Sequence, residues 1–105
     1  MAASAVYNFN DIIQGTTFPG VTLTVYVNGS PLNLSGASIT MVFNNGQYTW
    51  STSTGELTIT NPAGGEFTVD SQVVSLRKER YHYYMRFNLS GGIIKKYITG
   101  IWRVE

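Results

Sequence analysis

Few side chains in this chain of 105 residues could carry out catalysis or hold a metal. His82 is the single histidine and cysteine is absent, so a serine–histidine–aspartate triad would depend on His82, and a zinc site would lack ligands. Asp11, Glu56, Glu66 and Asp70 could form a calcium site or the paired acids of a glycosidase only if folding brought them together. We therefore expect a protein without catalysis, metal or cofactor, which acts by contact.

The last third of the chain, residues 80–105, has the pattern of one long β-hairpin. Two alternating runs flank Gly91-Gly92, a pair suited to the positive φ angles of a two-residue turn. Such a turn predicts five facing pairs on the apolar side: Tyr81 and Trp102, Tyr83 and Gly100, Met85 and Ile98, Phe87 and Lys96, and Leu89 and Ile94. This side should face the core, with the ring of Tyr83 covering the gap left by Gly100. Four large side chains are predicted to be buried between two sheets: Phe43, Tyr81, Phe87 and Trp102.

The opposite side of the same hairpin is basic and aromatic. We predict that it is a protein-contact face, because Tyr, Trp and Arg are enriched where proteins bury each other, and because an isoleucine among them has no reason to face water. The candidate contact residues are Tyr84, Arg86, Lys95, Tyr97, Ile101 and Arg103. Arg86 and Tyr97 are expected to be neighbours, so that the guanidinium could stack on the ring and still bind an acidic partner.

Charge is distributed unevenly, although the formal net charge is only +1. All seven Lys and Arg lie between Arg77 and Arg103, whereas residues 1–76 hold four acids and no Lys or Arg. This asymmetry favours a complementary contact, either with a copy of the same protein or with another protein. Aromatic side chains among cations can also stack on bases, but a nearly neutral domain lacks the basic footprint of a nucleic-acid binder, so nucleic acid is not the expected partner.

The rest of the chain shows period-two alternation and no helix-period segment. Turns rich in Gly, Asn and Pro separate the alternating runs at intervals of about 8 to 12 residues, which is typical of sandwiches and small barrels. The sequence predicts a single all-β domain over residues 1–105, an antiparallel β-sandwich of about seven to nine strands, with residues 1–5 loose. Because neither a signal peptide nor an apolar membrane-spanning run is visible, no membrane association is expected.

Four segments occur in an order that resembles small phage and prophage virion domains, in particular the N-terminal domain of phage baseplate upper proteins. They are residues 14–20 (QGTTFPG), 28–39 (NGSPLNLSGASI), 61–69 (NPAGGEFTV) and 97–104 (YITGIWRV). The resemblance implies an immunoglobulin-like sandwich located in a virion, non-catalytic and without a cofactor, whose partners are other virion proteins. Baseplate upper proteins continue into further domains whereas this chain ends at Glu105, so tail, baseplate, head fibre and capsid surface all stay open.

A carbohydrate-binding or adhesion module is the alternative function. Exposed aromatic rings can stack on sugars, and the candidates for this are Tyr26, Trp50, Tyr84 and Tyr97. An exposed coplanar pair in a groove would favour sugar binding, whereas a flat patch that includes Ile101 would favour protein contact.

Overall fold

The computed structural model describes residues 5–105, and this part of the chain contains strands and turns but no helix. The seven longer strands are β3 (Val21–Thr24), β6 (Ser38–Phe43), β7 (Tyr48–Ser51), β8 (Leu57–Asn61), β9 (Glu66–Val69), β11 (Glu79–Leu89) and β12 (Ile93–Val104). Five strands in this part have only two residues: β1 (Ala5–Val6), β2 (Thr17–Phe18), β4 (Tyr26–Val27), β5 (Ser30–Pro31) and β10 (Gln72–Val73). The predicted all-β class is confirmed, and the short strands raise the count above the expected seven to nine. Of the terminus predicted to be loose, residues 1–4 lie outside the described residues, and Ala5 belongs to β1.

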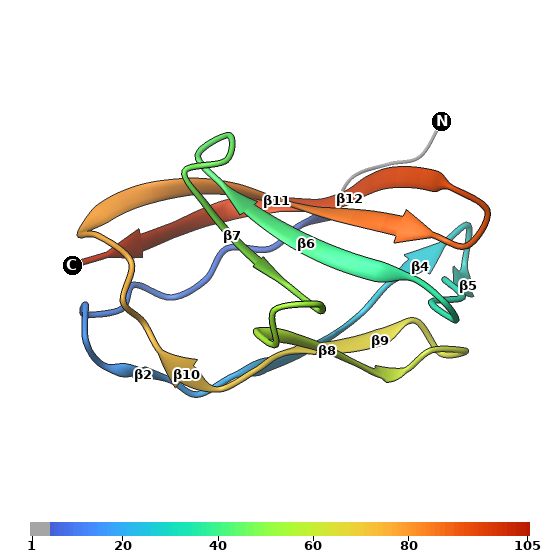
Figure 1. Cartoon of the computed structure of the whole chain (residues 1–105), viewed down its shortest axis with the longest axis horizontal. Helices are drawn as coiled ribbons and strands as arrows, with labels where there is room; N and C mark the ends of the chain where they lie inside the picture. The colour runs from blue at the N-terminus through green and yellow to red at the C-terminus, as the bar shows by residue number, and fades with distance from the viewer. Residues whose placement is uncertain (1–4) are drawn as a thin grey trace.

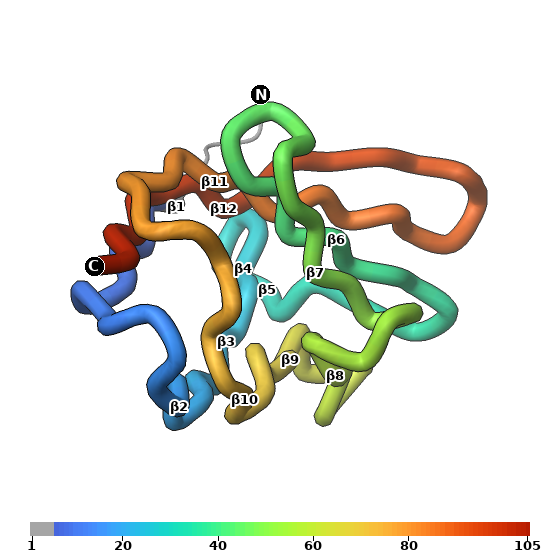
Figure 2. The backbone as a smooth tube through the Cα atoms, turned by 60° about the vertical axis from the view of Figure 1, so that its left-hand side comes forward, coloured from blue at the N-terminus to red at the C-terminus, as the bar shows by residue number. Residues whose placement is uncertain are grey.

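The strands form two facing layers, as expected for a β-sandwich (Figure 1). One layer is a five-stranded sheet in the order β1-β12-β11-β6-β7, and the other contains the three-stranded sheet β3-β9-β8. Within the described part, the strand pairs are antiparallel except at one edge, where β1 runs parallel to β12. The long β11–β12 hairpin spans the larger layer, and its tip projects beyond the neighbouring strands (Figure 2).

Aromatic side chains fill the core between the layers. All four residues predicted for this core are fully buried: Phe43, Tyr81, Phe87 and Trp102. The indole of Trp102 stacks on Phe9, with ring centroids 4.6 Å apart, and its Nε1 donates a hydrogen bond to the carbonyl of Asn10 at 2.9 Å. Buried aromatic area with its polar atom satisfied is strongly stabilising, so this residue ties the N-terminal segment to β12.

The N-terminal segment follows the edge of β12, and Gly100 is what allows this close approach. The amide of Tyr7 donates to the carbonyl of Thr99 at 2.9 Å. A Cβ atom on Gly100 would lie 1.9 Å from the carbonyl oxygen of Tyr7 and 2.8 Å from the ring of Tyr83. The prediction that Tyr83 covers Gly100 is therefore confirmed, and the backbone at Tyr7 is a second, unpredicted reason for glycine at this position.

The terminal hairpin is present, but only part of its predicted register is correct. Three of the predicted pairs are observed: Tyr81 with Trp102, Tyr83 with Gly100, and Met85 with Ile98. Beyond Met85 the pairing shifts by one residue, so Phe87 faces Lys95 and Leu89 faces Ile93. The predicted partners Lys96 and Ile94 are therefore wrong. The connecting loop, residues 90–92, has three residues rather than two, since a Gly-Gly pair signals a turn without fixing its length.

Tyr97 is the extra residue that absorbs this shift, as a β-bulge in β12. Because a bulge breaks the alternation of faces, Tyr97 and Ile98 are both buried although they are consecutive. The ring of Tyr97 lies 5.7 Å from that of Phe87, in the core. The prediction that Tyr97 faces outward beside Arg86 is therefore wrong.

Candidate protein-contact face

The candidate site is the outer surface of β11 and β12, called here the hairpin outer face. It consists of Arg80, His82, Tyr84, Arg86, Lys96, Thr99, Ile101 and Arg103. On β11 these residues alternate with buried ones, so strand geometry alone aims them away from the core. On β12 the bulge at Tyr97 resets the alternation, which places Lys96 on this face.

The predicted contact residues do not all lie on this face. Tyr84, Arg86 and Ile101 are there and are partly buried, and Arg103 is there and exposed. Lys95 is exposed, but it pairs with Phe87 and so lies on the opposite side of the hairpin, near its tip.

Lys96 lies opposite Arg86, where the sequence pattern predicted Tyr97. Its Nζ lies 4.3 Å from the centroid of the Tyr84 ring, a cation–π arrangement. Strict alternation could not have revealed this contact, because it depends on the bulge.

Two pairs of cations stand directly opposite each other on this face. Arg86 pairs with Lys96, and Arg80 pairs with Arg103. The Cβ atoms of directly opposed residues are about 4.5–5.5 Å apart, and like charges at that separation are destabilising. These opposed charges therefore work against formation of the hairpin, apart from the cation–π contact of Lys96 with Tyr84.

Within residues 5–105, little negative charge offsets the three arginines of these pairs, Arg80, Arg86 and Arg103. Arg103 approaches Glu105 at 4.0 Å, but both side chains are about half exposed or more, so this ion pair is weak. Within residues 5–105, no carboxylate lies within 4.0 Å of Arg80 or Arg86. In the same part of the chain, the buried Nε of Arg86 has no hydrogen-bond partner.

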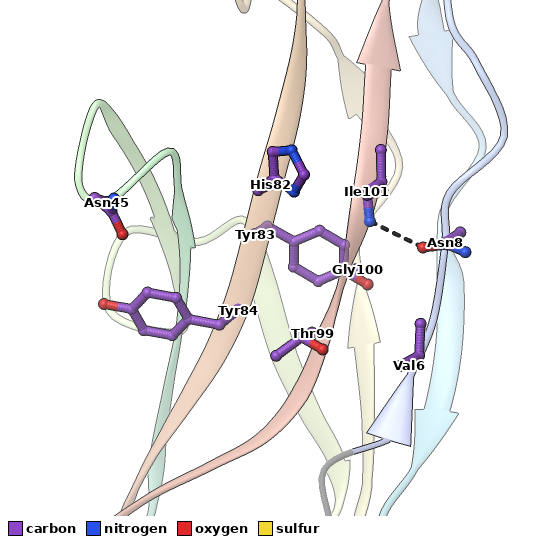
Figure 3. A pocket seen from close by; sticks show the side chains of 9 residues that line it. All are labelled: Val6, Asn8, Asn45, His82, Tyr83, Tyr84, Thr99, Gly100 and Ile101. Carbon is purple, nitrogen blue, oxygen red and sulfur yellow. Dashed lines mark hydrogen bonds between the residues drawn. The ribbon is translucent and has the colours of Figure 1, made fainter.

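A groove of about 450 Å³ opens in the hairpin outer face (Figure 3). His82, Tyr84, Thr99 and Ile101 lie across its middle, with Val6 and Asn8 on one side and Asn45 on the other. Both sides are held by hydrogen bonds to the hairpin backbone. Asn8 Oδ1 accepts from the amide of Ile101 at 3.0 Å, and Asn44 Oδ1 accepts from the amide of His82 at 3.0 Å. The groove is therefore part of the folded sheet.

Two buried tyrosines lie beneath this face, on the core side of β11. Burial raises the pKa of Tyr81 to about 12, with smaller contributions from Tyr48 and Glu79. Burial also raises the pKa of Tyr83, well above its usual value of 10, with a smaller effect of Tyr7. The Tyr83 hydroxyl donates a hydrogen bond to the carbonyl of Tyr7, and both phenols are held neutral at ordinary pH.

The aromatic residues predicted to stack on sugars are mostly unavailable. Trp50 and Tyr97 are each only 7% exposed. Tyr26 is 63% exposed, but it lies on β4, and no ring contact joins it to Tyr84 in the described part. The patch that includes Ile101 thus fits the expected pattern for protein contact better than that for sugar binding.

Residues 5–105 contain no group of three or more His, Asp or Glu side chains that could hold a metal ion. That part of the chain also has no helix long and apolar enough to span a membrane. No family model, curated protein or solved structure matches the chain.

Proposed function

We propose that the protein is a non-catalytic structural module of a phage virion and that it acts through protein contacts at the hairpin outer face. The observation that carries the contact role is that two pairs of opposed cations flank the partly buried Tyr84 and Ile101. Natural sequences tend to break local rules at functional sites, and like charges directly opposite each other break such a rule. A partner with carboxylates would offset the repulsion and cover the isoleucine.

The virion assignment is supported by the four ordered segments that resemble phage baseplate upper domains. The all-β sandwich is compatible with that resemblance. The test is mass spectrometry of purified virions from a host that encodes the chain. The protein should be found in particles at a fixed ratio to the other structural proteins, and its absence from them would contradict the virion assignment.

The contact role is tested separately, by the double variant Arg86→Glu/Ile101→Asp. Neither side chain belongs to the core, so the domain should fold with nearly unchanged melting but should no longer enter particles. The matched control is Arg77→Glu/Val73→Asp, which also replaces one Arg by Glu and one aliphatic residue by Asp, at two exposed positions off this face. Normal incorporation of the first variant would exclude the hairpin outer face as the contact surface.

A small carbohydrate is the second candidate ligand, and the groove is the observation that favours it. Its volume of about 450 Å³ lies in the range of small-molecule sites, and Asn45, His82 and Tyr84 supply polar atoms and a ring. Binding on a glycan array that is lost in Tyr84→Ala would support this role.

A further inference from the structure

We propose that the hairpin outer face binds the acidic outer face of the three-stranded sheet on a second copy of this chain, so that copies join head to tail. The inference deepens the proposed function and rests on it, because it names the partner of the same face. Three features of the described residues carry it: the opposed cations, the position of the carboxylates, and the placement of the two faces on opposite layers.

The first feature is the repulsion within the hairpin outer face. The pairs Arg80–Arg103 and Arg86–Lys96 lie six residues apart along β11, which is about 20 Å at the usual strand rise. Cations at both ends of the face thus bracket Tyr84 and Ile101. This arrangement suits an anionic surface with some apolar area rather than a single small ion.

The second feature is an acidic surface on the other sheet, called here the threonine face. It consists of Thr22, Thr24, Thr58, Thr60, Glu66, Thr68 and Asp70. Asp70 Oδ2 accepts a hydrogen bond from Thr58 at 2.6 Å, and Glu66 Oε1 accepts one from Thr60 at 2.9 Å. Neither carboxylate lies within 4.0 Å of a cation in residues 5–105, so their negative charge is not offset within the described chain.

The threonine face suits a protein partner in rigidity as well as in charge. Thr22, Thr68 and Thr58 form a row across three neighbouring strands, and Thr22 and Thr68 share a hydrogen bond of 2.9 Å. β-branched side chains are stiff, so this surface loses little conformational freedom when it is covered. It therefore offers a pre-ordered acidic surface to the basic hairpin of another copy.

The third feature is placement. The hairpin outer face belongs to the larger layer and the threonine face to the smaller layer, with the core between them (Figure 1). A contact between two different faces is heterologous, so it propagates into a ring or an open stack rather than a two-fold dimer. The net charge of only +1 means that overall repulsion opposes such stacking little.

The experiment uses two variants that each remove two charges from one face, studied by analytical ultracentrifugation at low salt. Arg86→Gln/Lys96→Gln disables the hairpin outer face, and Glu66→Gln/Asp70→Asn disables the threonine face while keeping acceptors for Thr58 and Thr60. Wild type should form concentration-dependent oligomers. Their association constant should fall at least about tenfold when salt rises from about 0.05 to about 0.5 M, because salt screens the interaction between the charges. Each variant alone should be monomeric, and an equimolar mixture should give a 1:1 dimer that grows no further.

The controls remove charges outside the two faces, so they separate the effect of net charge from the effect of each face. Arg77→Gln/Lys78→Gln removes two cations outside the hairpin outer face, and Asp11→Asn removes an acid outside the threonine face. Both controls should associate like wild type. The variants of the hairpin outer face and of the threonine face should keep the cooperative melting of folded domains.

Several results would overturn the inference. These are a wild type that stays monomeric at low salt, continued self-association of Glu66→Gln/Asp70→Asn, or a mixture that does not form the 1:1 dimer. Tight binding of a single-stranded DNA oligonucleotide by a monomeric wild type would also overturn it, since the cations would then bind the phosphate groups of the DNA. The proposed function would survive the first result if Arg86→Glu/Ile101→Asp still fails to enter virions, because a different virion protein would then be the partner.

Discussion

At the scale of single residues, Gly100 and Tyr83 explain how the N-terminal segment is held. The sequence suggested their pairing, because alternation places them opposite each other in the hairpin. It gave no sign of Tyr7, whose carbonyl occupies the space where a side chain on Gly100 would be. A backbone contact between residues 93 positions apart leaves no local pattern in the sequence, so only the fold reveals it.

Gly100→Ala should therefore destabilise the domain strongly. The new methyl would overlap the carbonyl of Tyr7, and relief requires the N-terminal segment to leave β12. We expect a loss of about 2–4 kcal/mol in the free energy of unfolding, as for overpacking joined to loss of neighbouring contacts. Urea denaturation measures it.

Gly91→Ala is the comparison for that experiment. Gly91 has a positive φ of 86° but open space around it, so the cost there should be about 1 kcal/mol, from backbone conformation alone. Equal costs at the two positions would contradict the account of Gly100.

Stability should fall above pH 10, because of the two buried tyrosines. Burial raises the pKa of Tyr81 to about 12 and that of Tyr83 further. Both phenols stay protonated in the folded state after the unfolded chain has begun to lose these protons. Their contribution is complete below about pH 10 and decreases as pH rises through 12, at about 1 kcal/mol per pH unit for each group.

Urea midpoints measured between about pH 8 and about pH 11 should show this slope. Tyr83→Phe should reduce the slope while lowering stability at neutral pH through loss of the hydrogen bond to Tyr7. Tyr26→Phe, at an exposed ring, controls for the removal of a phenol elsewhere. A stability that is flat up to pH 11 would argue against burial of the two rings.

At the scale of elements, the bulge in β12 decides which side chains lie on the outer face of the hairpin. Alternation predicted the strands, the apolar side and the first half of the register, because each of these follows from a period of two. It could not predict an extra residue, and a single bulge moved Tyr97 into the core and brought Lys96 opposite Arg86. The Arg86–Lys96 pair therefore could not be predicted from the sequence, whereas the Arg80–Arg103 pair lies in the half of the register that alternation predicts.

Two single variants, Tyr97→Asp and Lys96→Asp, test the position of the bulge when their stabilities are compared. A carboxylate in place of the buried Tyr97 would be unpaired among apolar rings, so we expect a loss of at least about 3 kcal/mol or failure to fold. The same substitution at exposed Lys96 should change stability by less than about 1 kcal/mol, since it loses a cation–π contact and gains an opposite charge facing Arg86. Thermal melting of both variants measures this difference. A Lys96→Asp variant that is less stable than Tyr97→Asp would support the uninterrupted register, without a bulge.

At the scale of the whole molecule, charge is separated between the two layers of the sandwich. The sequence showed the separation along the chain, with acids in the first 76 residues and cations after them. The fold converts it into two outer faces, because β3, β8 and β9 form one layer while β11 and β12 lie in the other. A domain with basic and acidic outer faces on opposite sides is suited to stacking on copies of itself.

The central claim is that the opposed cations serve a contact and not the fold, and Arg80→Glu tests it most directly. The new carboxylate would face Arg103 across the strands, turning repulsion into attraction. For dilute, monomeric protein we predict a free energy of unfolding raised by up to about 1 kcal/mol. In sedimentation at higher concentration, the same variant should associate more weakly than wild type. Arg77→Glu, the same charge change in an exposed loop, should alter neither quantity. A less stable monomer, or association as strong as that of wild type, would contradict the account.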